Sequence, residues 1–149
     1  MKKLIQKLAV VMLLVCCFFM CDGEALAVDT MQEIVQYGDG TYAEITLTED
    51  DMMSRTTTKT GTKTYTYKSA SGNIIFTYTL KTYFQYDGST SRAVTCSTTY
   101  NIVKSGWSKK SDSHYCSGNK AYGTAKFSNS STSRDVSLTI TCSKDGKIS

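Results

Sequence analysis

The chain is poor in the residues from which enzymes build active sites. It contains no proline, one histidine and one tryptophan, and after Asp51 it contains no glutamate and four aspartates. Two of these, Asp87 and Asp145, precede glycines in turn-like segments, where aspartate serves the backbone. Few candidates remain for a pair of catalytic carboxylates. Because proline is absent, no slow prolyl isomerisation is expected in folding.

The motifs of common metal and cofactor sites are also missing. The sequence has no C-x-x-C or H-E-x-x-H pattern, no phosphate-binding glycine loop and no G-x-S-x-G elbow. No segment after the N-terminal apolar run shows a helical period. We therefore expect a non-enzymatic chain with no cofactor and no metal.

One short cluster keeps an enzymatic alternative open. Ser113-His114-Tyr115-Cys116 is similar to the Ser-His-Gly-Cys signature of L,D-transpeptidases, which act on bacterial cell walls. Tyr115 replaces the glycine, and the upstream histidine and downstream arginine of those enzymes are missing. Side chains two residues apart on a strand lie roughly 6–7 Å from each other, beyond hydrogen-bond reach. A cell-wall thiol enzyme is the weakest of three functional hypotheses.

The N-terminus has the pattern of a signal peptide. Three lysines precede an uncharged apolar run, Leu8 to Met20, and Ala25-Leu26-Ala27 follows as a cleavage pattern. Thirteen apolar residues are too few to span a bilayer comfortably, which argues against an uncleaved anchor. We predict a signal peptide over 1-27, cleavage after Ala27, and a secreted, extracellular chain without a transmembrane segment.

Three of the six cysteines remain after this cleavage, namely Cys96, Cys116 and Cys142. An odd number outside the cell predicts one disulfide and one leftover thiol. Strand alternation turns Cys96 and Cys142 inward, so we predict a Cys96–Cys142 disulfide and a free thiol at Cys116. The chain would then be a monomer, or a dimer linked through Cys116. Alternatively all three are reduced, with the two inward cysteines as small core residues.

Charge divides the chain into an acidic leader and a basic body. Seven acidic residues and no basic ones lie between Val28 and Asp51, whereas fourteen basic and four acidic residues follow from Met52 onward. We predict an N-terminal leader or arm over 28-55 and a single β-sandwich domain over 56-149. The leader is a flexible tether, an arm along the basic body, or a disordered terminus. Within it, the alternating Ala43, Ile45 and Leu47 could form a short strand.

The clearest strand signal lies between Asn73 and Tyr86. A period of two places large residues on one side, which predicts a strand with one face in a core. Those residues are Ile74, Phe76, Tyr78, Leu80, Thr82, Phe84 and Tyr86.

Turn signals divide the rest of the body into short strands. Asp87-Gly88 predicts one hairpin. Gly118-Asn119 predicts another, with Tyr115 opposite Tyr122 and Cys116 opposite Ala121. Residues 58–68 alternate threonine with lysine or tyrosine, as on an edge strand. About six strands in the body, or seven with the leader, indicate an all-β fold, an antiparallel β-sandwich, with an Ig-like domain or a small barrel as alternatives.

Several segments of the body resemble small exported Gram-positive (Clostridia-type) β-sandwich proteins of unknown function. The segments are Thr64-Tyr65-Thr66-Tyr67, Tyr86-Asp87-Gly88-Ser89-Thr90-Ser91, Ser105-Gly106-Trp107-Ser108, Ser117-Gly118-Asn119 and Val136-Ser137-Leu138-Thr139-Ile140-Thr141-Cys142-Ser143. The resemblance spans about residues 58–149. It implies a β-sandwich and no known activity.

Aromatic residues make binding the favoured class of function. Ten tyrosines against five phenylalanines give a sheet surface of rings with polar tips. Our candidate ligand-binding residues are Trp107, Tyr83, Tyr122 and Tyr65, which could stack on sugars. Alternatively, Trp107 packs in the core and the tyrosines are ordinary strand residues.

The basic body favours anionic partners such as teichoic acids, acidic glycans or lipids. Nucleic acid would fit the same charge, but export argues against it. The first hypothesis is therefore a binding module for a cell-wall polymer or glycan, of the cell envelope or of a host surface. The second is a bacteriocin-like toxin that acts on competitor envelopes.

Overall fold

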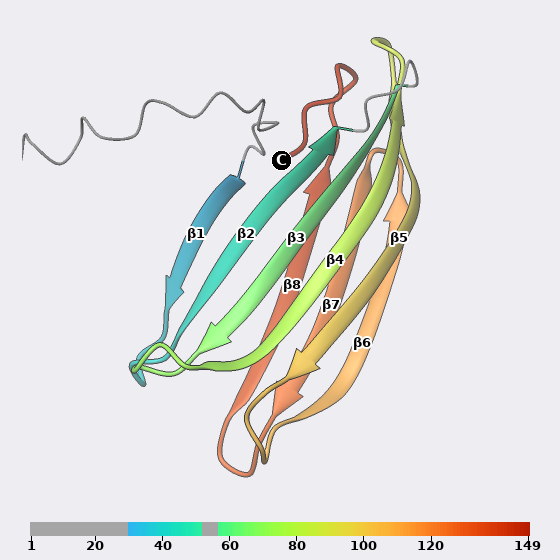
Figure 1. Cartoon of the computed structure of the whole chain (residues 1–149). Coiled ribbons are helices and arrows are strands. Elements are labelled where there is room, and N and C mark those ends of the chain that lie inside the picture. Colours follow the sequence, from blue (N-terminus) through green and yellow to red (C-terminus); the bar gives the residue numbers. More distant parts are fainter. Residues whose placement is uncertain (1–29, 52–56) are drawn as a thin grey trace, which may run out of the picture.

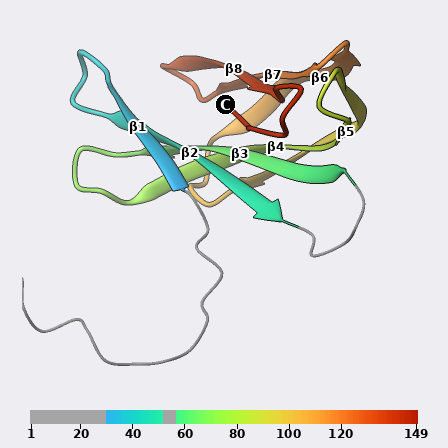
Figure 2. The same ribbon diagram turned by 90° about the horizontal axis from the view of Figure 1, so that it is seen from above.

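The computed structural model describes residues 30–51, with the backbone alone at position 51, and residues 57–149. They form an all-β sandwich of eight antiparallel strands in two packed sheets (Figures 1 and 2). The strands are β1 (Thr30–Gln36), β2 (Tyr42–Asp51), β3 (Thr58–Lys68), β4 (Ile74–Tyr86), β5 (Ser91–Ile102), β6 (Ser108–Ser117), β7 (Lys120–Ser128) and β8 (Ser133–Thr141). The predicted signal peptide lies outside the described residues.

Each strand pairs with its neighbour in sequence. The first five form one sheet in the order β1-β2-β3-β4-β5, and the last three form a second sheet in the order β6-β7-β8. The chain passes from one sheet to the other after β5 (Figure 1). This confirms the predicted antiparallel sandwich, but as two consecutive meanders, without the crossover connections of an Ig-like domain.

Residues assigned to the leader belong to the larger sheet. β1 pairs with β2, and β2 pairs with β3 along its whole length. Ala43 and Leu47 are buried, and the acids of β2 meet lysines of β3: Glu44 lies 2.7 Å from Lys68, and Glu49 lies 3.1 Å from Lys59. The acidic segment therefore joins the basic body as two strands, and the sandwich begins before the predicted boundary at residue 56.

The predicted central strand, β4, carries the core. Phe76, Tyr78, Leu80, Thr82 and Phe84 are all buried, as the alternation predicts. At the start of the strand Ile75 is buried and Ile74 is 41% exposed, the reverse of the prediction. The pairing with β3 shifts by one residue there, and such a bulge exchanges the two faces of a strand.

β3 is the middle strand of its sheet, although its lysines suggested an edge. Its partners Leu47 and Leu80 flank Lys63, which therefore shares their inner face. The Lys63 ammonium reaches the other sheet and donates to the carbonyl of Thr139 at 3.1 Å. A lysine in this position shows that charge alone does not identify an edge strand.

The small residues of β7 let the sheets approach closely. Ala121 and Ala125 are buried, and a Cβ at Gly123 would lie 3.3 Å from a methyl of Leu80. On β3, a Cβ at Gly61 would lie 3.0 Å from a methyl of Ile140. These two glycines are therefore explained by sheet-to-sheet distance.

The two sides of the sandwich are closed in different ways. On one side a disulfide joins Cys96 of β5 to Cys116 of β6, with their Cα atoms 6.1 Å apart. On the other side residues 143–149 fold back against β8, where Ile148 is buried and its amide donates to Glu49 at 3.1 Å. We call the first side, formed by β5 and β6, the disulfide flank.

This pairing replaces the predicted Cys96–Cys142 disulfide. Alternation identified the face of each strand correctly, since Cys142 is buried and Cys96 is partly buried. Alternation could not show where each strand lies within its sheet. Cys96 lies on β5 beside β6, whereas Cys142 follows β8 at the opposite side of the sandwich. Cys142 is the free cysteine, and burial raises the pKa of its thiol. Because Cys116 is paired within the chain, a dimer linked through it is not supported.

Within residues 30–51 and 57–149, the structure contains no helix long and apolar enough to cross a membrane. The same residues contain no cluster of three or more histidine, cysteine or acidic side chains that could hold a metal ion.

Candidate functional site

Of the four aromatic residues predicted to bind ligand, one lies in the core and one packs against it. Tyr65 is buried, its hydroxyl lies 2.7 Å from that of Tyr37, and burial raises its pKa well above the usual value. The Trp107 ring lies 5.5 Å from that of Tyr67 and 5.4 Å from that of Phe76. Trp107 thus closes one end of an aromatic core, the alternative that sequence reasoning left open.

The other two lie on opposite outer faces. Tyr83 is on the outer face of the larger sheet, half-buried, with the Lys81 ammonium 5.6 Å from its ring centre. Tyr122 is on the outer face of the smaller sheet, because its neighbours Ala121 and Gly123 point inward. The structure does not bring the four candidates together.

Tyr122 has an aromatic partner that was not among the candidates. Tyr115 of β6 lies directly opposite it in register, with ring centres 4.7 Å apart and ring planes inclined by 19°. Tyr115 is 57% exposed, one of the most exposed large apolar side chains described. We call this stacked pair the tyrosine platform. The predicted register already placed these two residues opposite each other, so the sequence contained the signal.

Hydroxyl side chains surround the platform on the same face. Thr139 of β8 lies in register with Tyr122, and the next row along the strands is Ser113, Thr124 and Ser137. A shallow depression lies beside that row; its lining residues are Ser111, Thr124, Ala125, Lys126, Asp135, Val136 and Ser137. Short hydroxyl side chains and the exposed ring of Tyr115 can hold a ligand that has both apolar faces and many hydroxyls.

Charges border this face at both ends. Lys126 and Asp135 lie in register across β7 and β8, 3.6 Å apart, and both side chains are well exposed. Lys120, also exposed, lies beyond the platform at the other end of β7. An exposed pair of this kind holds its partners weakly, so both charges can also contact a ligand.

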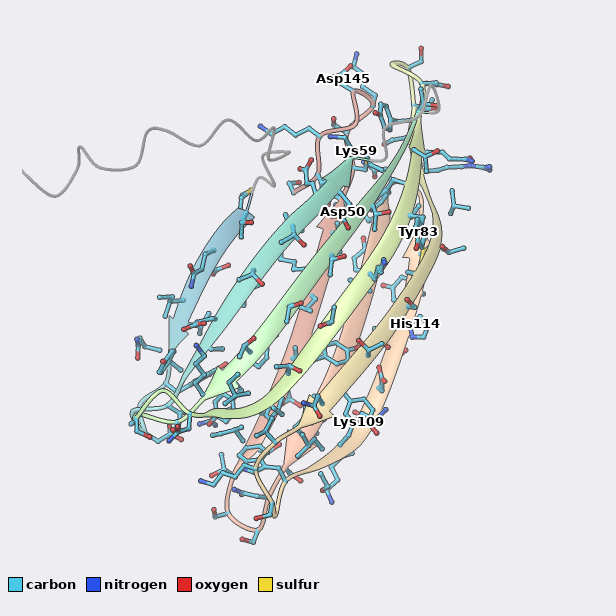
Figure 3. All side chains as sticks on the ribbon, viewed as in Figure 1. Asp50, Lys59, Tyr83, Lys109, His114 and Asp145 are labelled. Atoms are coloured by element: carbon cyan, nitrogen blue, oxygen red, sulfur yellow. A yellow bond between two sulfur atoms is a disulfide. The ribbon has the colours of Figure 1, made fainter. Side chains whose placement is uncertain are left out.

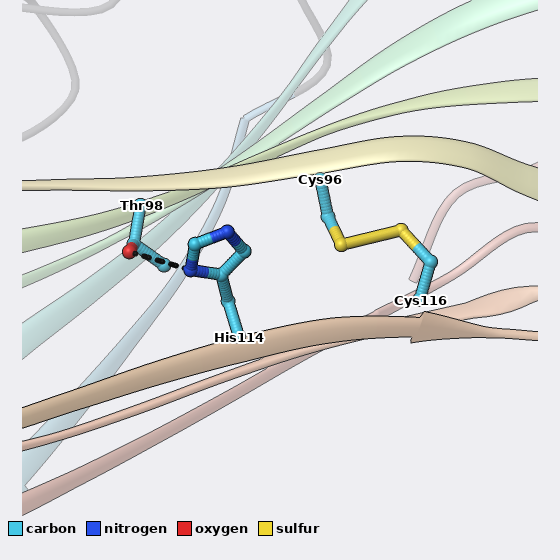
Figure 4. Close-up of a disulfide and its surroundings, with 4 residues drawn as sticks. All are labelled: Cys96, Thr98, His114 and Cys116. Carbon is cyan, nitrogen blue, oxygen red and sulfur yellow. Dashed lines mark hydrogen bonds between the residues drawn. A yellow bond between two sulfur atoms is a disulfide. The ribbon is translucent and has the colours of Figure 1, made fainter.

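The region of the thiol-enzyme hypothesis is the disulfide flank (Figures 3 and 4). His114 projects from β6, and its Nδ1 lies 3.2 Å from the Thr98 hydroxyl of β5. Cys116, two residues on, is joined to Cys96 and has no thiol to act as a nucleophile. His114 and Cys116 thus each bind a residue of β5, and these contacts hold the edges of the two sheets together.

Asp112 extends this closure into the core. Its Oδ1 accepts hydrogen bonds from the hydroxyls of Tyr78 at 2.9 Å and Thr98 at 3.1 Å, and its Oδ2 lies 3.0 Å from the Lys109 ammonium. Partial burial would raise the pKa of Asp112, but the bonds from Lys109, Tyr78 and Thr98 outweigh it, so the pKa is lowered. Burial and the bond to Asp112 raise the pKa of Tyr78 to about 12.

Comparisons with known proteins identify no family. No family model matches the chain, and no curated protein matches it. Among solved structures, the chain is similar to hypothetical protein lmo2686 from Listeria monocytogenes EGD-e, with a TM-score of 0.44 and 15% sequence identity. The similarity covers 80% of this chain and 90% of that one. That protein is described as hypothetical, so the similarity assigns no function to the present chain.

Proposed function

We propose that this chain is an exported, non-enzymatic binding module that holds a glycan of a cell envelope or host surface on the outer face of its smaller sheet. The observation that carries the proposal is the tyrosine platform, a stacked pair in which Tyr115 is the most exposed aromatic side chain of the described residues and Tyr122 is half-buried.

The chemistry of the face fits a sugar polymer. Sugar rings have apolar faces that stack on aromatic rings and hydroxyls that exchange hydrogen bonds with serine and threonine. The platform supplies the first contact, and the row of Ser113, Thr124 and Ser137 supplies the second. Lys120 adds positive charge at one end, whereas Asp135 balances Lys126 at the other, so the expected preference for acidic glycans and teichoic acids over neutral polymers depends on Lys120.

The test is co-sedimentation of the chain, recovered from the medium of an expressing bacterium, with washed bacterial envelopes and with purified peptidoglycan. We expect saturable binding that one soluble polymer competes away. Tyr115→Ala and Tyr122→Ala should each weaken binding about tenfold, equivalent to about 1.4 kcal/mol. Tyr115→Phe, which keeps the ring, should bind nearly as well as the unchanged chain.

The matched control is Tyr83→Ala, which removes a half-buried tyrosine from the outer face of the other sheet. It should leave binding unchanged. If Tyr83→Ala weakens binding and the two platform variants do not, the ligand lies on the larger sheet and the proposed site is wrong. If the chain sediments with no envelope or polymer, the proposed function itself is wrong.

A further inference from the structure

A second feature suited to binding is the side of the sandwich opposite the disulfide flank. The smaller sheet is two strands narrower than the larger one, and its outer strand β8 lies against β3 and β4. Among the described residues, no strand of the smaller sheet comes into close backbone contact with β1 or β2. The inner face of β1 and β2, which we call the roof, therefore extends beyond β8; Met31 and Glu33 on it are exposed, whereas Ala43 and Leu47 are buried.

The edge of β8 already accepts an antiparallel strand at one end. Thr141 and Ser149 exchange two backbone hydrogen bonds, of 2.8 and 2.9 Å, and Cys142 forms a bridge with Ile148. Backbone groups on a strand alternate between its two sides, so Thr139, Ser137 and Asp135 direct theirs to the same side as Thr141. That side of β8 has no strand partner between Ser133 and Thr139 within the described chain.

The roof above this edge is largely apolar. Leu47 lies in register with Met31, and Ile45 lies in register with Glu33, all on the inner face. Together they border a depression lined by Met31, Gln32, Glu33, Ile45, Leu47, Lys63 and Ser149. Met31 is 56% exposed there. We call the space between this roof and the edge of β8 the strand slot.

Two side chains mark the ends of the strand slot. Lys63 crosses it to the carbonyl of Thr139, and Arg134 crosses it to Asp39 and to the Tyr67 hydroxyl, which is 2.9 Å from Nε. Between these crossings lie the edge-facing backbone groups of Asp135 and Ser137. At about 3.3 Å per residue, this length suits an extended segment of about four or five residues.

We propose that the strand slot binds a short extended segment of another polypeptide, antiparallel to β8 and in line with residues 147–149, with alternate apolar side chains against Ile45 and Met31. The main chain of the guest would pair with β8, which is recognition by β-strand addition. The roof supplies the apolar contact that gives the guest its alternating pattern.

The geometry favours an isolated strand over a second copy of this chain. Two β8 strands paired antiparallel are related by a two-fold axis perpendicular to their common sheet. Both larger sheets would then lie on the same side of that common sheet. The β3 strand of one copy would occupy the place of β2 of the other. The overhanging roof thus excludes this pairing and admits a bare segment, such as a tail or linker of a partner.

The experiment uses a synthetic peptide with three valines alternating with threonines and a lysine at each end. A control peptide has the same composition with its valines adjacent. We expect the alternating peptide to bind the chain and to slow hydrogen exchange at the amides of Asp135 and Ser137 at least tenfold. The control peptide should do neither.

Two variants of β1 provide the matched comparison. Met31 and Ile34 are both 56% exposed, but Met31 is on the inner face and Ile34 is on the outer face. Met31→Lys should weaken peptide binding at least tenfold, and Ile34→Lys should leave it unchanged. Ser137→Pro removes an amide that points away from β7, so it should block binding with the sandwich intact.

Thermal unfolding establishes that each variant is folded, and the two lysine variants keep the test valid if Ser137→Pro unfolds. The proposal is overturned if the alternating peptide leaves the β8 amides unprotected, or if Met31→Lys and Ile34→Lys bind it equally. Lys63 and Arg134 would then be charged side chains that prevent the β8 edge from pairing with another strand. Tyr115→Ala should not alter peptide binding, so this result is independent of the proposed glycan site.

Discussion

Asp112 shows how a single polar side chain can connect both sheets. Tyr78 of β4, Thr98 of β5 and Lys109 of β6 all donate to its carboxylate. A carboxylate that accepts several hydrogen bonds is favoured in its ionised form, which is why its pKa is lowered. Asp112 should therefore contribute to the pH dependence of stability.

We predict that Asp112→Asn makes the chain less sensitive to acid. Because the pKa is lower in the folded chain than the ordinary value of 3.8, the carboxylate stabilises the fold above that value and ceases to do so as pH falls through the lowered pKa. Near neutral pH the variant should lose about 1–2 kcal/mol, typical of a partly exposed hydrogen-bonded charge. The measurement is urea unfolding from about pH 7 to about pH 2.

Asp145→Asn serves as the control, since it makes the same charge change at an exposed turn residue. Its unfolding curve should shift with acid as that of the unchanged chain does. Equal acid sensitivity of the Asp112→Asn variant and the unchanged chain would show that the network around Asp112 adds no pH-dependent stability.

The burial of a residue was predicted correctly where it depends on strand alternation. It was predicted wrongly where it depends on the position of the strand within its sheet. Burial of Phe76 and Leu80 follows from a period of two. The burial of Tyr65 does not follow from its polar strand, because it depends on β2 and β4 covering both sides of β3. Likewise, Tyr115 was not selected, although its predicted register with Tyr122 was correct.

At the scale of elements, the disulfide flank joins two strands that belong to different sheets. β5 and β6 are edge strands, and the Cys96–Cys116 disulfide links them across a sequence separation of 20. In the chain-entropy account, closing a loop of this length contributes about 3 kcal/mol.

We predict that peptide mapping under non-reducing conditions finds Cys96 linked to Cys116, with Cys142 alkylated only after unfolding. A double substitution, Cys96→Ser with Cys116→Ser, should lower the free energy of unfolding by about 3 kcal/mol in urea titrations. The same double variant should be insensitive to reducing agent. A peptide that links Cys96 to Cys142 would contradict the assignment and restore the pairing expected from alternation alone.

Element boundaries were predictable where turns have a local signature. The hairpin around Gly118-Asn119 has the expected register from Ser117 and Lys120 outward. β2 was expected only as a possible short strand over Ala43, Ile45 and Leu47, because the acids that follow it suggest a solvated segment. In the structure Glu44 and Glu49 each meet a lysine of β3. Ion pairs of this kind join residues far apart in sequence, so they cannot be predicted from the composition of one segment.

For the whole molecule, the sandwich was predictable and its division into unequal sheets was not. Strand alternation and turn spacing indicate a fold of two layers. The number of strands in each layer depends on where the chain crosses from one sheet to the other. The crossing follows β5, and Trp107 anchors it against Tyr67 and Phe76. Nothing in the local pattern of residues 103–107 distinguishes this crossing from another hairpin.

The predicted export concerns the whole chain and can be tested directly. When the gene is expressed in a bacterial host, the medium should contain a chain that begins at Val28, because the A-x-A pattern ends at Ala27. Intact-mass measurement of the secreted protein tests this. A mass that includes residues 1–27, or a chain found solely with the cells, would contradict cleavage and secretion.

The consecutive pairing of all strands within each sheet has a consequence for how the chain folds during the export that we predict. Hairpins between sequence neighbours keep contact order low for a β protein, because each closes a short loop. A chain that emerges from a translocase N-terminus first can pair its strands in the order of their appearance. The long-range links, Arg134 to Asp39 and Ile148 to Glu49, would form after the hairpins of the larger sheet, because each joins a late segment to an early one.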